Sequence, residues 1–556
     1  MTAYTARWIP VLILALAACA REGDVGARAS SEQQGTETAA PAEPAKERLG
    51  TVRFPVSCGE AAARHAQRGL ALLHHMTYED ARDAFAAAVE ADPECAMGYW
   101  GQAMTFVHPL WSDPPSEADF EHARVLLEEA ASRGEKAGWE SAYVVAAQGY
   151  FAAGWDGDER DNLAAFKTGW EQVHRDFPDD PEATGLYALS LLATADPADR
   201  TYAQQVQAGA LTEGVLKRIP DHPAGHHYTI HAYDYPPLAE KALAAAQNYG
   251  RIAPEVPHAL HMPSHIFTRL GRWPDVIEWN DRSAAAAYAQ PVEDHVSMHY
   301  FHALDYVAYA HLQQGQDSKA DEVRRQVEGF DGSAHVHLAT AYTLAAVPAR
   351  VALERQRWAE AAALELGGPE TFPWASFPQA EAITQFARAL GAARSGDTET
   401  AQQALERLAA LRETAAATSA YWGEQIEIQS LIAGAWLLDA QGRKEEGLEQ
   451  MQRATELEAG TDKHPVTPGE VLPATELLGE MLLAADRPDE ALAAYERALT
   501  RSPNRLNGLY GAGRAAEQVG DAEKAKRYYT ALVELTEPAD SELESRRRAA
   551  AYLEEG

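Results

Sequence analysis

The sequence predicts an all-α protein built from stacked helix pairs, because one residue pattern recurs near both ends of the chain and no pattern predicts a sheet. The pattern combines small residues, one aromatic residue and a proline at intervals of four, three and five residues: Ala81, Phe85, Ala88 and Pro93, and again Ala491, Tyr495, Ala498 and Pro503. Positions three and four apart share a helix face, so alanines beside one ring allow a second helix to pack closely. No run of alternating apolar and polar residues between turn residues indicates β-strands.

The period of this pattern identifies the type of array. Ala491 and Ala525, like Tyr495 and Tyr529, are 34 residues apart. This period with this pattern resembles the tetratricopeptide repeat (TPR). The resemblance implies a right-handed α-solenoid of TPR-like helix pairs over most of residues 58–535. The concave face of such an array usually binds a peptide, a protein or a small-molecule ligand.

The amino-terminal residues predict export and a lipid anchor. Residues 8–18 are apolar but too short to cross a bilayer, which is typical of a signal peptide. The segment Leu16-Ala17-Ala18-Cys19 resembles the lipobox of bacterial lipoproteins, which implies cleavage before Cys19 and lipidation of that cysteine. A plain secretory signal with an incidental cysteine is the alternative. Because Ala20 is not aspartate, the resemblance favours a bacterial outer membrane, with the protein facing the periplasm.

Composition and repeat signals divide the chain into six expected segments. They are a signal peptide (1–18), a disordered tether (19–52), N-terminal TPR-like repeats (53–220), histidine-rich central repeats (221–325), middle helical repeats (326–460) and C-terminal TPR repeats (461–556). The tether has almost no large apolar side chain with which to form a core. Cys58 and Cys95 remain after Cys19, and an even pair in an oxidising compartment is expected to form a disulfide; two separate buried thiols are the alternative.

Charge and absent motifs exclude several functions. The 556 residues include 83 acidic and 48 basic side chains, a net charge of −35, which repels a nucleic-acid backbone. The sequence has no Gly-rich phosphate loop, no Gly-x-Ser-x-Gly motif, no His-Glu-x-x-His motif and no Cys-x-x-Cys motif. We therefore expect no nucleic-acid partner, and hydrolase or nucleotide-dependent activities lose support.

Histidines are concentrated in the central segment. Ten of the 20 histidines lie between His222 and His302, and six of them form three His-x-x-x-His pairs that recur every 34 residues. Both rings of such a pair point from one helix face, which makes each pair a two-nitrogen claw for a metal ion. With two further histidines, the candidate ligands are His227, His231, His258, His261, His265, His295, His299 and His302. The isolated histidines are expected at the surface or at helix caps: His74, His75, His108, His335, His337 and His464.

The cluster predicts one or two transition-metal ions. Neutral imidazole binds zinc, copper, iron and nickel, and we expect copper or iron rather than zinc because the excess of imidazoles suggests two centres. Asp234 is the nearest carboxylate; it could bind the metal, orient a histidine or face solvent. A metal-free histidine-lined ligand pocket and purely structural histidines are the alternatives. The segments His258–Phe267, Cys95–Gly101 and Pro503–Arg505 also resemble a broad bacterial group of TPR proteins, which names no substrate.

Two functions follow. The first is an envelope-anchored TPR lipoprotein whose concave histidine site supports metal-dependent oxidation with dioxygen, with Asp234 as the candidate catalytic residue. The second is a non-enzymatic scaffold that binds a peptide or partner protein in the cell envelope. The sequence leaves open whether the protein is an enzyme.

Overall fold

The computed structural model describes residues 47–111, 113–292 and 294–555, and these residues form one compact unit. These residues form α-helices, two short 3-10 helices and two isolated β-bridges, with no named strand among them. The predicted all-α fold of stacked, TPR-like helix pairs is confirmed. The predicted signal peptide and Cys19 lie outside the described residues.

The first helices in the chain run from the end of the amino-terminal segment to the start of the histidine-rich region. They are α1 (Glu60–His74), α2 (Tyr78–Ala91), α3 (Ala96–Met104), α4 (Glu117–Ser132), α5 (Gly138–Tyr150), α6 (Glu159–Asp176), α7 (Pro181–Ala193) and α8 (Ala203–Arg218).

The central helices carry the histidines. They are α9 (Pro223–Tyr233), η1 (Ala239–Ala242), α10 (Leu243–Ile252), α11 (Pro257–His261), α12 (Pro263–Arg269), α13 (Trp273–Tyr288), α14 (Met298–Gln313), α15 (Asp317–Glu328) and α16 (Leu338–Glu354).

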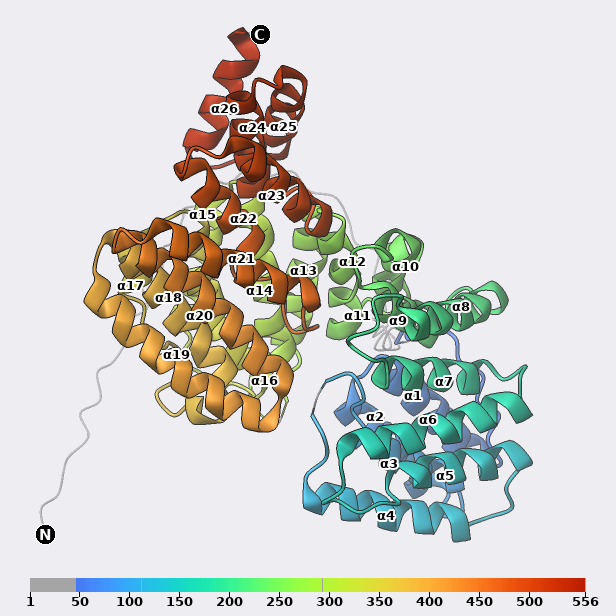
Figure 1. The fold of residues 1–556 in the computed structure, drawn as a ribbon. Helices are drawn as coiled ribbons and strands as arrows, with labels where there is room; N and C mark the ends of the chain where they lie inside the picture. Colours follow the sequence, from blue (N-terminus) through green and yellow to red (C-terminus); the bar gives the residue numbers. More distant parts are fainter. Residues whose placement is uncertain (1–46, 112, 293, 556) are drawn as a thin grey trace, which may run out of the picture. The chain divides into compact units, whose positions relative to one another are not determined.

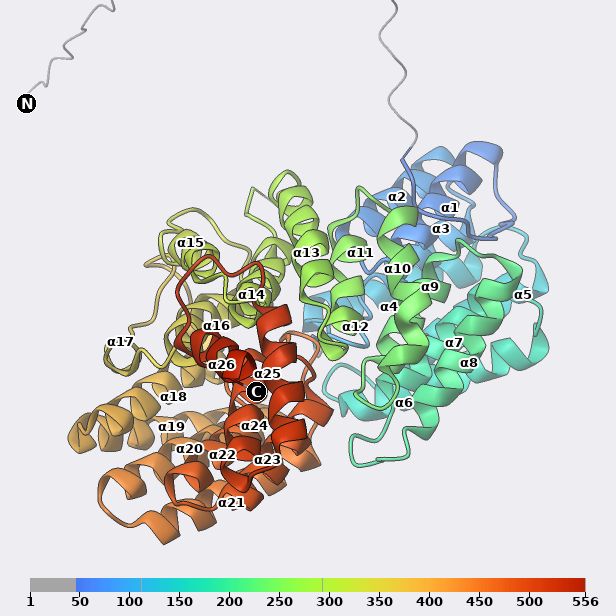
Figure 2. The same ribbon diagram turned by 90° about the horizontal axis from the view of Figure 1, so that it is seen from above.

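The remaining helices complete the array. They are α17 (Trp358–Ala362), η2 (Trp374–Ser376), α18 (Pro378–Ser395), α19 (Thr398–Thr418), α20 (Ala420–Ala440), α21 (Lys444–Gly460), α22 (Ala474–Ala484), α23 (Pro488–Arg501), α24 (Leu506–Val519), α25 (Ala522–Leu535) and α26 (Glu544–Glu555). Consecutive helices pack against each other along most of the chain, as the stacked rows in Figures 1 and 2 show.

The repeated aromatic residue fills the gap left by glycines on two neighbouring helices. A Cβ atom added to Gly69 of α1 or Gly101 of α3 would lie within 2.9 Å or 2.2 Å of the ring of Phe85 on α2. Tyr495 of α23 packs in the same way between Gly479 and Gly511, where the corresponding distances are 2.7 Å and 2.1 Å. Close helix packing around one ring is therefore the physical basis of the repeat.

An extended segment precedes the first helix. Leu49 of this segment is buried, and so are three alternate residues that follow it: Val52, Phe54 and Val56. Residues 47–52, the end of the predicted tether, are therefore packed against the helices. Cys58, at the end of the segment, and Cys95, which precedes α3, form a disulfide with their Cα atoms 5.0 Å apart.

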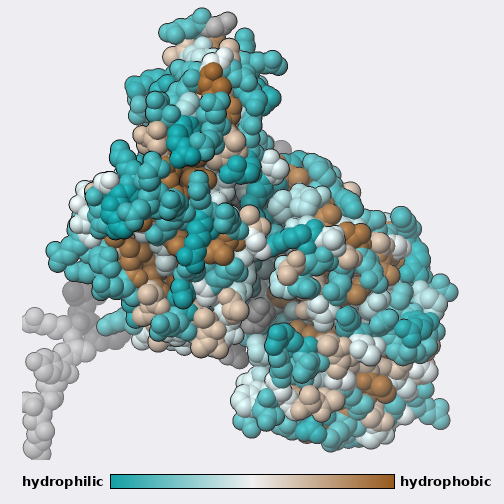
Figure 3. Space-filling model, in the orientation of Figure 1, coloured by the Kyte–Doolittle hydropathy of each residue, from teal (hydrophilic) through white to brown (hydrophobic). Residues whose placement is uncertain are grey.

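The face of the molecule seen in Figure 3 is mainly hydrophilic. Figure 3 shows apolar residues scattered among hydrophilic ones on the visible face. No helix among the described residues is both long enough and apolar enough to cross a membrane.

Candidate metal centre

Six histidines from four neighbouring helices gather in the central repeats. They are His227 and His231 on α9, His258 and His261 on α11, His265 on α12, and His302 on α14. Pro263 begins α12 after one residue, Met262, that follows α11, and proline is tolerated there because the first helical position needs no N–H donor. The two short helices therefore present their histidines close together.

The first triad consists of His227, His231 and His258. Nε2 of His227 lies 3.1 Å from Nε2 of His231 and 3.1 Å from Nε2 of His258. Nδ1 of His227 donates to the backbone oxygen of His74 at 2.6 Å, which fixes the orientation of the ring. Two imidazoles bound to one ion at about 2.0–2.1 Å have nitrogens about 2.8–3.4 Å apart for angles between a right angle and the tetrahedral angle. The spacing therefore fits a shared ion.

The second triad consists of His261, His265 and His302. Nε2 of His261 lies 3.0 Å from Nε2 of His265, and the ring centroids of His261 and His302 are 4.1 Å apart. In each triad, one nitrogen from every histidine lies within 4.8 Å of the other two. The ring of Tyr306 packs against all three histidines of the second triad, and its hydroxyl oxygen lies 3.5 Å from Nε2 of His265.

Hydrogen bonds assign the proton positions of two rings in the second triad. The amide nitrogen of Asn280 donates to the carbonyl of Val276, so its Oδ1 accepts from Nδ1 of His261 at 2.7 Å. The carboxylate of Asp234 accepts from Nδ1 of His265 at 2.8 Å. A neutral imidazole carries one N–H. Both Nε2 atoms therefore present lone pairs to each other across 3.0 Å.

Asp234 follows α9 and is held by two cations. Oδ1 accepts from Nε of Arg269 at 2.8 Å, and Oδ2 accepts from Nζ of Lys463 at 2.9 Å. Burial alone would raise the pKa of Asp234, but the charges of Lys463 and Arg269 hold it well below its ordinary value. Burial lowers the pKa of Lys463 to about 8. Of the three roles considered for Asp234, the observed contacts fit the orientation of a histidine.

Burial keeps the imidazoles neutral. It is the main cause that lowers the pKa of every histidine in the two triads, and neighbouring imidazoles lower most of these values further. The pKa of His231, for example, falls to about 3. Neutral rings keep the lone pairs that a metal ion needs.

The two triads are adjacent. The ring centroids of His231 and His265 are 6.1 Å apart, and those of His258 and His261 are 6.3 Å apart. Each triad combines a pair separated by four residues with a third ring from a later helix, which is α11 in the first triad and α14 in the second. Two ions held by these triads would therefore be neighbours in one site.

Two predicted ligands lie outside the triads. His299 is in the first turn of α14, with its ring 5.2 Å from that of His258. His295 lies in the loop before α14, which begins at Met298. The expectation that His295 and His299 share one helix face is therefore wrong, because the third helix starts too late to include both.

His74 and His75 lie at the end of α1 and are both buried. His75 is the C-cap residue of α1, one of the two positions expected for it, but neither ring lies at the surface. Nε2 of His74 lies 2.8 Å from the carboxylate of Glu182, and Nδ1 of His75 lies 2.9 Å from the hydroxyl of Tyr249. The second nitrogen of His75 donates to the carbonyl of Leu49. Burial of His75 was not expected because Leu49 was assigned to the tether, whereas His74 is covered by Glu182 and Tyr228 from other repeats.

Five further residues around the site were not predicted: Trp111, Arg269, Asn280, Tyr306 and Lys463. Arg269 is four residues after His265, so helical spacing could have indicated it. Lys463 comes from the segment between α21 and α22, 229 residues from Asp234 in sequence. No local signal connects residues so far apart.

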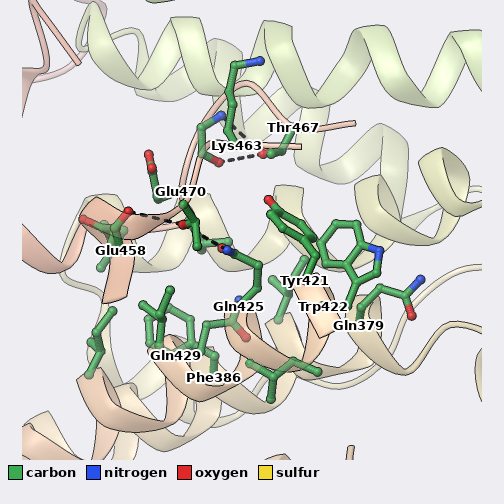
Figure 4. A pocket seen from close by; sticks show the side chains of 18 of the residues that line it. Gln379, Phe386, Tyr421, Trp422, Gln425, Gln429, Glu458, Lys463, Thr467 and Glu470 are labelled. Atoms are coloured by element: carbon green, nitrogen blue, oxygen red, sulfur yellow. Dashed lines mark hydrogen bonds between the residues drawn. The ribbon is translucent and has the colours of Figure 1, made fainter. Parts of the chain in front are cut away.

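Lys463 also lines a small cavity in the middle repeats, which Figure 4 shows from close by. The cavity has a volume of about 50 Å³, enough for water but not for a substrate, and Tyr421, Glu458 and Glu470 are among its lining residues. Lys463 extends its side chain away from the other labelled residues in the view. No triad histidine lines this cavity, so it is separate from the candidate metal centre.

Comparison with known proteins supports the repeat but names no function. Residues 506–538, which span α24 and α25, match the tetratricopeptide repeat family. No curated protein matches the chain. The P58(IPK) TPR domain has 12% identity, with 89% of this chain and 98% of that chain covered and a TM-score of 0.20. The human IFIT1 dimer with PPP-AAAA has 12% identity, with 88% of this chain and 99% of that chain covered and a TM-score of 0.36. Similarity at this level indicates no ligand for this chain.

Proposed function

We propose that this TPR-repeat protein binds two transition-metal ions, one in each histidine triad. The observation that carries this proposal is the pair of lone pairs on His261 and His265, 3.0 Å apart. Two lone pairs at this distance repel each other unless a positive charge lies between them. A proton is disfavoured because burial lowers the pKa of both rings, whereas a metal ion would bind both nitrogens.

The donor set favours copper and a catalytic role. Neither triad includes a carboxylate or a thiolate, and copper binds nitrogen ligands most tightly among the divalent first-row metals. Iron sites of the oxygen-activating type normally include a carboxylate ligand. Three protein ligands for each ion leave coordination positions open, as in catalytic rather than structural metal sites. We assign to the pair the metal-dependent oxidation of a bound ligand with dioxygen.

The proposed location is the bacterial cell envelope. The residues around Cys19 support a lipid anchor, and the Cys58–Cys95 disulfide supports an oxidising compartment. Mass spectrometry of the protein purified from membranes tests this: a diacylglycerol-modified cysteine at the mature amino terminus is expected. A soluble protein cleaved elsewhere would contradict the anchor.

Metal analysis tests the proposed function directly. The purified protein, loaded with copper and freed of excess ion, should contain about two ions per chain by inductively coupled plasma mass spectrometry. His231→Ala and His265→Ala should each reduce this to about one, because each removes a ligand from a different triad. His311→Ala is the matched control: His311 lies on α14, nine residues after His302, and bonds Gln316 instead.

The outcomes separate the two candidate functions. Two ions in the control and one in each triad variant would support the metal centre. Protein that binds no ion, with unchanged capture of a partner protein, would favour the scaffold. An unchanged content in both triad variants would show that the ions bind elsewhere.

A further inference from the structure

Two metal ions in this site would create a charge that the protein does not compensate. The triads supply six neutral imidazoles and no anionic ligand. Asp234 is the carboxylate hydrogen-bonded to a triad ring, and Arg269 and Lys463 already bind it. Two divalent ions would therefore add four positive charges to a buried region, and burying uncompensated charge is costly. An anion from solution would offset part of that charge.

Unpaired nitrogen atoms gather beside both triads. Nε1 of Trp111 is buried without a hydrogen-bond partner, and so are Nδ1 of His258, His299 and His302. The ring of Trp111 lies 5.4 Å from that of His258, 6.1 Å from His299 and 6.5 Å from His302. Buried polar groups in proteins are normally paired, so the indole nitrogen and three imidazole nitrogens without partners point to a ligand at this place.

Two of these nitrogens are hydrogen-bond donors in the metal-loaded site. Nε2 of His258 faces Nε2 of His227, so His258 would bind the first ion through Nε2. Its neutral ring then keeps the proton on Nδ1, which makes that atom a donor. The indole Nε1 of Trp111 is also a donor and never an acceptor. The metal-loaded site therefore offers at least two N–H groups that require an acceptor.

Trp111 is placed to contact a ligand from outside the triads. It lies between α3 and α4 in the N-terminal repeats, whereas the histidines belong to the central repeats. Its side chain is partly buried and is not itself a ligand in either triad. A molecule that accepts hydrogen bonds from the indole and from a histidine would contact both groups of repeats.

We propose that Trp111, His258, His299 and His302 form the binding site for a small anion, such as a carboxylate or another oxyanion, beside the two metal ions. This proposal rests on the proposed metal centre. The anion accepts hydrogen bonds from Trp111 Nε1 and His258 Nδ1 and offsets the charge of the ions. It gives the substrate class of the site: a small molecule with a negatively charged acceptor group.

Azide titration of the copper(II)-loaded protein tests the proposal, because azide bound to copper(II) gives a charge-transfer absorption band. Trp111→Phe keeps an aromatic ring but removes the N–H donor. We expect this variant to retain two copper ions and to bind azide about tenfold more weakly, which is the effect of one lost hydrogen bond to a charged group. Trp100→Phe is the matched control, because its Nε1 is also buried and unpaired but lies among Phe85, Tyr143 and Trp170.

The results distinguish the failure of each proposal. Two copper ions with unchanged azide affinity in Trp111→Phe would overturn the anion site and leave the metal centre intact. Wild-type protein that binds no copper would overturn both. Should Trp111→Phe fail to fold by circular dichroism, His299→Leu replaces it: we expect two retained ions and weaker azide binding. Loss of an ion in His299→Leu would instead make His299 a metal ligand and contradict its place in the anion site.

Discussion

Replacement of Asp234 by asparagine tests whether this carboxylate orients His265 for metal binding. The asparagine keeps the size of the side chain but removes the negative charge that accepts from Nδ1 of His265. The ring of His265 is then no longer held in the tautomer that points a lone pair at the metal. Loss of such an outer contact typically costs 10–100-fold in metal affinity. We expect a loss of about that size for the second ion and little change for the first.

The same substitution should destabilise the metal-free protein. Asp234 bonds the side chains of Arg269 and Lys463, all of which are less than a tenth exposed. Removing one partner of a buried ion pair typically costs about 3–5 kcal/mol. Because burial lowers the pKa of Lys463 to about 8, loss of its proton would relieve part of this cost. We therefore expect about 3 kcal/mol, measured by urea unfolding.

A matched variant separates the loss of stability from the loss of metal. Asp305 pairs with Arg350 at 2.8 Å, and both side chains are fully buried. Asp305→Asn should therefore cost a similar free energy of unfolding while leaving both copper affinities unchanged in a chelator competition assay. If Asp234→Asn left both copper affinities unchanged, as Asp305→Asn should, or lowered both equally, Asp234 would have no specific role in orienting His265.

Three further predictions concern the fold. Burial lowers the pKa of His75 to about 3, below its value in the unfolded chain, so the neutral ring's contribution to stability is complete above about pH 6.5 and is lost as the pH falls towards 3. In urea unfolding of the metal-free protein between pH 7 and pH 4, His75→Gln should reduce the change of unfolding free energy with pH by up to about 1.4 kcal/mol per pH unit. The same pH dependence in wild type and variant would contradict this. Cys58→Ser should lower the free energy of unfolding by about 4 kcal/mol, the loop-closure entropy expected for a disulfide that closes a loop of 37 residues. A variant as stable as the oxidised wild-type protein would contradict this. Gly101→Ala should cost about 1–3 kcal/mol because its Cβ would meet an aromatic ring at 2.2 Å, whereas Gly138→Ala, with no atom within 4 Å, should leave the thermal midpoint nearly unchanged.

Local features of the fold could be predicted because they depend on residues close in sequence. Gly396 and Gly520 end α18 and α24 in the left-handed conformation that glycine adopts easily. Asp397 and Asp521 then cap the next helices by accepting from backbone N–H groups. Each signal lies within a few residues of the boundary that it marks.

In the candidate site, too, only the contacts between residues close in sequence could be predicted. Spacing of four residues brings His227 and His231 together because one turn of α9 separates them. His261 and His265 have the same spacing, but they lie on α11 and α12, which Met262 joins in a helical conformation. The third member of each triad depends on how neighbouring helices are offset, which spacing alone does not determine. The 34-residue period suggested three equal pairs, but α14 begins after His295 and contributes His302 instead.

The residues around the triads come from three distant parts of the chain, and this has a consequence for how the site forms. Trp111 belongs to the N-terminal repeats, the histidines to the central repeats, and Lys463 to the segment between α21 and α22. In a solenoid, contacts usually link only adjacent repeats. Here Lys463 contacts Asp234 across 229 residues of sequence, so the ion pair forms only when the intervening repeats have folded. A complete site therefore requires the array, and the array supplies groups that no single repeat contains.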